Sequence, residues 1–198
     1  MTGRTEADPR VARRQARIAE VLDAAWQIAR EDGLAAVTLH EVARRVGLRQ
    51  PSLYSYVDSK AGLYDLMYAQ AYRTLLVEVA AAPQPADPRK ALVSVSRTIL
   101  EFVVDDAARQ QLLFQRTIPG FIPSADAYAL ATEFLETIVR QLRAAGVTSP
   151  TDIDIYTSMI AGLGAQQIAN DPGGDRWTKH LERVLKMFFS YIDAKKSH

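Results

Sequence analysis

Hydrophobic residues recur at helical spacing along most of this chain, and no stretch alternates as a β-strand would. Within residues 10–31, for example, Ile18, Leu22, Ala25 and Ile28 follow one another at steps of four, three and three. The same pattern predicts further helices over residues 39–46, 58–82, 88–105, 106–116, 124–145, 150–169 and 175–194. We therefore expect an all-α protein.

Glycine and proline mark the breaks between these helices. A Gly ends the first helix at position 33, three prolines interrupt residues 83–88, and the stretches 117–124 and 170–174 read as loops. Residues 1–9 are polar and are expected to be disordered.

The stretch from Thr38 to Leu63 predicts a compact arrangement of short helices. Thr38 is expected to cap the helix at 39–46, and Glu41, three residues later, completes a capping box. Gly47 stands where that helix stops and the chain turns.

A second short helix is expected at 49–56, starting at Arg49 or Gln50. Pro51 lies in its first turn, where a missing N–H has no cost. Asp58 or Ser59 caps the long helix that follows. Two short helices joined by a glycine turn are the signature of a helix-turn-helix motif.

This motif resembles that of the tetracycline-repressor-like (TetR) family of transcriptional regulators. The positions that carry the resemblance are Thr38, Val42, Ala43, Gly47, Leu48, Ser52, Leu53, Tyr54, Tyr56, Val57, Lys60 and Leu63. Three positions depart from the family pattern: Arg49 replaces the usual Ser or Thr, Pro51 stands where Gly is commoner, and Ala61 replaces an acidic residue. Arg49 and Pro51 fall on the expected reading surface, so they bear on which DNA sequence is bound.

The leading residues of a recognition helix meet base edges in the major groove. Here the candidates for base contacts are Arg49, Gln50, Pro51, Ser52 and Tyr54. Arg pairs in bidentate fashion with guanine and Gln with adenine, whereas Pro offers only apolar contact.

Phosphate contacts are expected from the hydroxyls of Thr38, Tyr54 and Tyr56 and from Lys60. Lys60 sits in the first turn of a helix, where the helix dipole disfavours a cation, and a phosphate held there would offset that penalty. Two alternatives stay open: Tyr54 belongs to the core of the N-terminal helices, or arginines such as Arg13, Arg14 and Arg44 are simply solvated.

Composition narrows the class of protein. The chain of 198 residues has a net charge of +1 and no Cys, so disulfides and Cys-based metal sites are excluded. No apolar run approaches the roughly 18 residues of a membrane span, and the N-terminus lacks the apolar core of a secretory signal. The three histidines are scattered at positions 40, 180 and 198. We expect a soluble cytoplasmic protein that is not an enzyme and has no cofactor, metal site or membrane partner.

The last two predicted helices have more apolar surface than one core requires. Two adjoining stripes run along the last helix, formed by Trp177, Leu181, Val184, Phe188 and Tyr191 and by Leu185, Phe189 and Ile192. The small residues of 161–165 would let another helix approach closely. These features predict a homodimer through two helices of each chain, unless both stripes belong to the core of one chain.

The resemblance also implies a cavity among the C-terminal helices that binds a small effector. Residues on helices that would surround such a space are Tyr68, Phe102, Phe114, Tyr128, Phe134, Met159 and Gln166. Aromatic and Met residues at this spacing are otherwise plain core.

These interpretations divide the chain into three segments. Residues 1–57 form an N-terminal arm and a helix-turn-helix DNA-binding domain, 58–82 a connecting helix shared by both domains, and 83–198 a helical effector-binding and dimerisation domain. The resemblance implies a homodimeric repressor that a small molecule releases from a near-palindromic DNA operator. The alternatives are a DNA-binding regulator without a ligand, and an enzyme or cargo-binding body with an inactive head.

Overall fold

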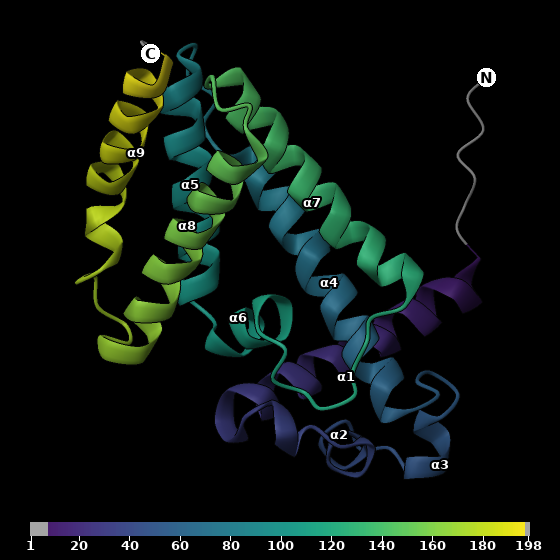
Figure 1. Ribbon diagram of the computed structural model, residues 1–198. Coiled ribbons are helices and arrows are strands. Elements are labelled where there is room, and N and C mark those ends of the chain that lie inside the picture. Colours follow the sequence, from purple (N-terminus) through teal and green to yellow (C-terminus); the bar gives the residue numbers. More distant parts are fainter. Residues whose placement is uncertain (1–7, 197–198) are drawn as a thin grey trace, which may run out of the picture.

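The computed structural model describes residues 8–196, and every regular element in that range is a helix (Figure 1). The elements are α1 (Pro9–Asp32), the short 3₁₀ helix η1 (Leu34–Ala36), α2 (Leu39–Arg45), α3 (Gln50–Leu53), α4 (Lys60–Ala81), α5 (Pro88–Val104), α6 (Ala107–Phe114), α7 (Ala125–Ala144), α8 (Pro150–Asn170), the 3₁₀ helix η2 (Thr178–His180) and α9 (Leu181–Lys196). The expected all-α fold is confirmed.

The first three helices form a small head at the lower end of the molecule (Figure 1). They pack because each contributes apolar side chains to one core. Val21, Ala25, Ile28, Val37, Val42 and Leu53 of this core are at most 1% exposed. The head is here defined as residues 9–57.

Helix α4 packs on both the head and the remaining helices. Leu63, near its start, and Leu75, near its end, are both fully buried. Beyond the head, α4 lies along α7, while α5 packs on α8 and α9 (Figure 1). Helix α6 crosses the base between these two layers. The body is here defined as α5 to α9.

Most helix boundaries fall within two residues of the prediction, because caps and breakers fix them locally. Asp8, Ser59, Asp87, Asp106 and Ser124 each accept backbone N–H groups at a helix start. Asp8 and Pro9 were expected to be disordered, but they open α1; residues 1–7 lie outside the described range.

Two boundaries differ more. Helix α3 ends at Leu53, and residues 54–56 continue as turns instead of helix. The last helix begins at Leu181 instead of residue 175, because the backbone N–H groups of Trp177 and Thr178 turn toward the buried side chain of Gln167. None of the described helices is long and apolar enough to cross a membrane.

Candidate nucleic-acid interface and body groove

Helix α2 is fixed at both of its ends, which sets the angle of the helix-turn-helix. The hydroxyl of Thr38 accepts the backbone N–H of Glu41 at 3.2 Å. At the other end, Gly47 adopts φ +66°, and the N–H of Leu48 donates to Ala43 O at 2.9 Å. A positive φ is open to Gly at little cost, so this turn depends on position 47.

The other half of the expected capping box is not formed. The carboxylate of Glu41 accepts hydrogen bonds from Arg44 and Arg45 instead of reaching back to the N-cap. Chiefly through the Arg44 hydrogen bond, the pKa of Glu41 falls from 4.5 to about 2. Arg45 also pairs with Glu31 of α1 at 2.5 Å. Both arginines therefore have partners within the head.

Helix α3 presents the predicted reading residues to solvent. Arg49, Gln50, Pro51 and Ser52 are all exposed, whereas Leu53 is buried and anchors the helix to the head. The side chain of Tyr54 is 48% exposed, so the alternative that it belongs to the core is wrong. Among the described residues, none of these polar side chains has a hydrogen-bond partner. They are free to bind an external one.

Three further predicted contact residues surround this surface. Thr38 is half-buried, with its hydroxyl used as a cap acceptor, and Tyr56 packs its ring partly against the core. Lys60 is exposed; its ammonium donates to Ala35 O at 3.2 Å and lies 5.6 Å from the centre of the Tyr64 ring. Lys60 is thus held beside the start of α4.

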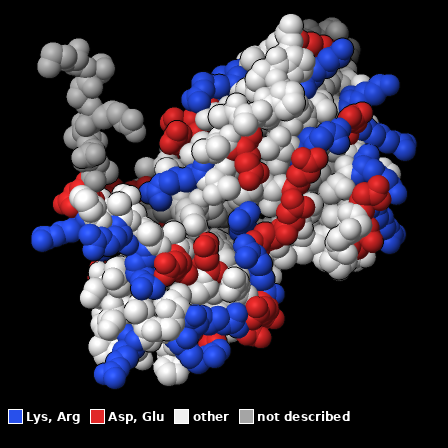
Figure 2. Space-filling model, turned by 180° about the vertical axis from the view of Figure 1, so that it is seen from behind, with Lys and Arg blue, Asp and Glu red and all other residues white. Residues whose placement is uncertain are grey.

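The arginines at the start of α1 lie next to the residues that follow α3. They line a shallow hollow of about 700 Å³ shared with Glu20, Ser55 and Tyr56, and Glu20 pairs with Arg17 at 2.5 Å. Figure 2 shows blue side chains gathered on this part of the molecule. The arginines concerned are Arg10, Arg13, Arg14 and Arg17. A duplex seated on α3 would meet a basic flank here.

The body contains a narrow apolar groove between α5, α6, α7 and α8, with a cavity volume of about 90 Å³. It is lined by Ile99, Leu100, Val103, Gln110, Phe114, Phe134, Leu135, Ile138, Tyr156, Thr157, Ile160 and Ala161. Gln110 is only 6% exposed, and its side-chain amide makes no hydrogen bond within the described range. Burial raises the pKa of Tyr156 to about 12, and its hydroxyl pairs with Ser96 Oγ at 2.7 Å.

Only two of the seven predicted ligand residues line this groove, Phe114 and Phe134, whose ring centroids are 6.5 Å apart. The other five lie elsewhere because their helices turn them away. Phe102 packs under Arg109, and the ring of Tyr68 lies tilted against that of Tyr72. Met159 packs against the core, Tyr128 is 61% exposed, and Gln166 is exposed and bonded to Asn170. The sequence signal that was missed is Gln110, a polar residue on the buried side of a short apolar helix.

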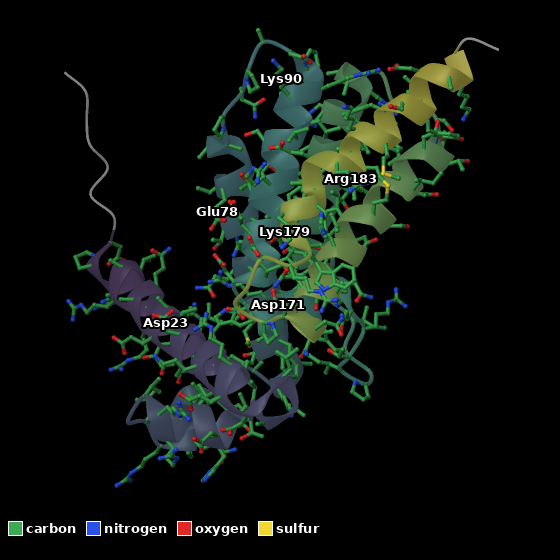
Figure 3. All side chains as sticks on the ribbon, turned by 90° about the vertical axis from the view of Figure 1, so that its left-hand side faces the viewer. Asp23, Glu78, Lys90, Asp171, Lys179 and Arg183 are labelled. Atoms are coloured by element: carbon green, nitrogen blue, oxygen red, sulfur yellow. The ribbon has the colours of Figure 1, made fainter. Side chains whose placement is uncertain are left out.

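The two apolar stripes of α9 are used mostly within the chain. Five of their residues are buried: Leu181, Leu185, Phe188, Phe189 and Ile192. Of the other three stripe residues, Trp177 and Val184 are half-buried and Tyr191 is exposed. Two apolar side chains outside the stripes are also exposed, Met187 of α9 and Ile155 of α8. Figure 3 looks onto this outer face, with Lys179 and Arg183 labelled on the α9 side. The alternative that the stripes belong to one core is correct for most of their length.

The two glycines of α8 also have different surroundings. A Cβ added at Gly164 would lie 3.1 Å from Val103 Cγ1, so this glycine allows α5 to pack closely. A Cβ at Gly162 would have nothing within 4 Å among the described atoms. Only Gly162 is open to a helix of another molecule.

The head is tied to the body by polar contacts that the sequence pattern did not reveal. Asp106, the cap of α6, is buried and accepts Arg30 Nε of α1 at 2.8 Å. Arg109 adds a second ion pair to the same carboxylate at 3.4 Å. Trp26 of α1 also donates to Gln70 of α4, the helix between head and body, at 2.7 Å. A movement of α6 would therefore change the contacts of α1.

Comparison with known proteins agrees with this geometry. Residues 21–67 match the family model described as bacterial regulatory proteins, tetR family. The chain is 28% identical over 163 residues to the HTH-type transcriptional regulator Rv1816 of Mycobacterium tuberculosis. The match covers 80% of this chain and 63% of that relative.

Two solved structures share the fold. SCO4313, which is named as a regulatory protein, aligns over 92% of this chain and 100% of its own with a TM-score of 0.74 and 24% identity. The transcriptional regulator FadR from Bacillus subtilis, solved in complex with stearoyl-CoA, aligns over 86% of this chain and 96% of its own, with a TM-score of 0.65 and 14% identity.

Proposed function

We propose that this chain, which is TetR-like in its head and in its fold, is a DNA-binding transcriptional regulator. The observation that carries the proposal is the exposed surface of α3, where Arg49, Gln50 and Ser52 project without partners beside a helix that is capped at both ends. Pre-positioned donors and acceptors of this kind suit the base edges of a major groove.

Each side chain has a distinct role in this proposal. Arg49 pairs with guanine, Gln50 with adenine, and Pro51 makes apolar contact such as with a thymine methyl. Thr38, Tyr54, Tyr56 and Lys60 hold phosphates, as do the arginines at the start of α1. The phosphate contacts fix the position of the protein on the duplex, and the α3 contacts determine which base sequence it prefers.

The functional unit is a homodimer joined through α8 and α9, so that two heads meet a near-palindromic operator in the cytoplasm. Gly162, Ile155, Met187 and Tyr191 supply the small and apolar positions for this interface. Analytical ultracentrifugation tests it: Met187→Glu shifts the protein to monomer, whereas Val77→Glu, an exposed apolar position on α4, leaves the dimer intact. A monomeric wild type would contradict this assembly.

The effector is an apolar small molecule bound in the groove between α5, α6, α7 and α8, with Gln110 as its polar anchor. The similar fold of FadR, which was solved with stearoyl-CoA, supports an elongated apolar ligand. The groove of about 90 Å³ must widen to admit one, since ligand pockets span roughly 300–1,000 Å³. Widening moves α6, and the Asp106–Arg30 contact carries that movement to the head and releases the operator.

Selection of bound fragments from a random DNA pool tests the whole proposal. We expect recovered sequences to share a motif with two-fold symmetry. Repeating the selection with long-chain acyl compounds should reduce recovery. Failure of the purified full-length protein to enrich any sequence would overturn DNA-binding regulation, and enrichment that no compound affects would overturn the effector alone.

A further inference from the structure

A second hollow, of about 550 Å³, lies where the head meets the body. Three segments enclose it: residues 33–35 after α1, the start of α4 at 60–64, and the loop 117–121 with Gln111 of α6. Among the described residues it has no lining residue in common with the body groove. Its volume falls within the roughly 300–1,000 Å³ of small-molecule sites.

Its walls and rim have different chemistry. Leu34, Ile118 and Phe121 give apolar walls, and the Phe121 ring lies 5.7 Å from the ring of Tyr64. Two polar groups at the hollow, the Gln111 amide and the Thr117 hydroxyl, make no hydrogen bond to any described residue. The side chain of Gln111 is half-buried and that of Thr117 is exposed, so both are accessible to a ligand that enters the hollow.

Lys60 provides the charge of the hollow. It is the only charged side chain among the described lining residues. Position 61, next to it, is an alanine, so no carboxylate of the lining neutralises the ammonium. Within residues 8–196 the ammonium makes one hydrogen bond, to a backbone carbonyl at 3.2 Å, besides its contact with the Tyr64 ring, and an ammonium has two further protons to donate.

We propose that this junction hollow binds small apolar carboxylates. The carboxylate accepts from Lys60 and Gln111, and the hydrocarbon or aromatic part lies against Leu34, Ile118 and Phe121. An anion is favoured over a neutral molecule of equal shape because a charge-assisted hydrogen bond to an ammonium is stronger than a neutral one.

Such binding has a consequence that rests on the proposed function. Lys60 is there a phosphate contact, and its ammonium cannot face a ligand carboxylate and a DNA phosphate at full strength together. Occupation of the hollow therefore weakens operator binding. This control is separate from the body groove, because it acts at the DNA contact itself.

Calorimetric titration of the full-length protein without DNA tests the site, with naphthalene-1-acetate and its neutral amide, naphthalene-1-acetamide, as probes. We expect the acid to bind about tenfold more tightly than the amide, the ratio that a charge-assisted hydrogen bond gives. Equal affinities for the two probes would overturn the proposal.

Matched variants locate the probe. Ala61→Asp is compatible with the first turn of α4, where the dipole favours an acid, so the chain keeps its fold. This variant should lose the preference for the acid, as should Lys60→Met, whereas Ala61→Ser should keep it. Leu135→Ala, in the body groove, should also keep it; loss of the preference there would place the acid in the groove and overturn the site.

A DNA competition completes the test. With saturating acid, operator affinity should fall several-fold for the wild type and remain unchanged for Ala61→Asp. If the acid binds with the expected preference and operator affinity does not change, competition at Lys60 is wrong. If the protein binds no DNA at all, the proposed function fails while the titration still decides the site.

Discussion

Arg49 is an exposed arginine whose guanidinium has no partner among the described residues, whereas Arg44 and Arg45 are held by the carboxylates of Glu41 and Glu31. A free guanidinium can turn both of its N–H pairs toward a base, and a paired one must first give up its partner. The three arginines therefore differ in what they can offer to DNA.

Arg49→Ala is expected to weaken operator binding by about 1–3 kcal/mol and to relax specificity at one base pair, because a bidentate contact to guanine is lost. Arg44→Ala is the matched control, and it should cost less and change no base preference. Fluorescence anisotropy on the operator and on its single-base variants measures both effects. Wild-type affinity and specificity in Arg49→Ala would remove Arg49 from the reading surface.

Glu41 makes the stability of the head depend on pH. Its pKa is about 2 in the folded state, below the 4.5 of the free group, so its ion pairs stabilise the head above pH 4.5 and are lost as the pH falls toward 2. Glu41→Gln should lower Tm at pH 7, and the difference from wild type should shrink steadily between pH 4.5 and pH 3. Calorimetric scans at several pH values check this; a difference that does not change with pH would contradict it.

At the scale of helices, α8 packs closely on α5 at one glycine and is open at another. A Cβ at position 164 lies 3.1 Å from Val103 Cγ1, and a β-branched side chain has little freedom to move aside. Replacing either glycine by Ala should stabilise the helix by about 1 kcal/mol through helix propensity. In Gly164→Ala, crowding against Val103 opposes this gain, whereas in Gly162→Ala nothing in the same chain opposes it. Chemical denaturation of a monomeric background such as Met187→Glu should find Gly162→Ala the more stable variant. Equal stabilities of the two variants would show that Val103 of α5 moves aside to admit the added methyl group.

Helix boundaries were predictable because the signals that set them are local. Ser59 caps α4 and Gly47 terminates α2 through bonds to residues only three to five positions away. The start of the last helix was not predictable in this way, because it depends on a bond from Trp177 to Gln167, which lies ten residues earlier in the chain. A long-range bond of this kind leaves no periodic trace in the sequence.

The exposure of the predicted reading residues follows from the sequence for the same reason, whereas the lining of the groove does not. Arg49 to Ser52 lie on one short segment, and a motif fixes their places. The groove combines side chains from four helices, among them Leu135 and Tyr156, whereas Tyr128 and Gln166 on two of the same helices are exposed. Periodicity identifies a buried face, but it does not say which neighbouring helix that face meets.

At the scale of the whole molecule, head and body are linked in two ways. Helix α4 packs on both, and α6 contacts α1, chiefly where the Asp106 carboxylate accepts Arg30. The helix is a continuous rigid link, whereas the ion pair can break and re-form. A change in the body groove, which α6 lines through Gln110 and Phe114, would reach the head through this contact.

Asp106→Asn separates these two connections. Asn still caps α6, so the helix remains, but the charge that holds Arg30 and Arg109 is lost. Because the Asp106 carboxylate is buried and both arginines are partly exposed, the loss of its charge should lower stability by roughly 1–3 kcal/mol. Operator affinity without effector should stay close to wild type, while the loss of affinity caused by an effector should fall several-fold, since coupling free energies are typically 1–3 kcal/mol.

Arg97→Gln is the matched control, because its ion pair with Glu182 at 2.6 Å joins α5 to α9 within the body alone. Operator affinities measured with and without effector for the three proteins give the coupling of each. The control should respond as the wild type does, and only Asp106→Asn should remain bound to DNA at effector concentrations that release the others. If Asp106→Asn releases DNA as readily as the wild type, the signal passes through α4 and not through the contact between α6 and α1.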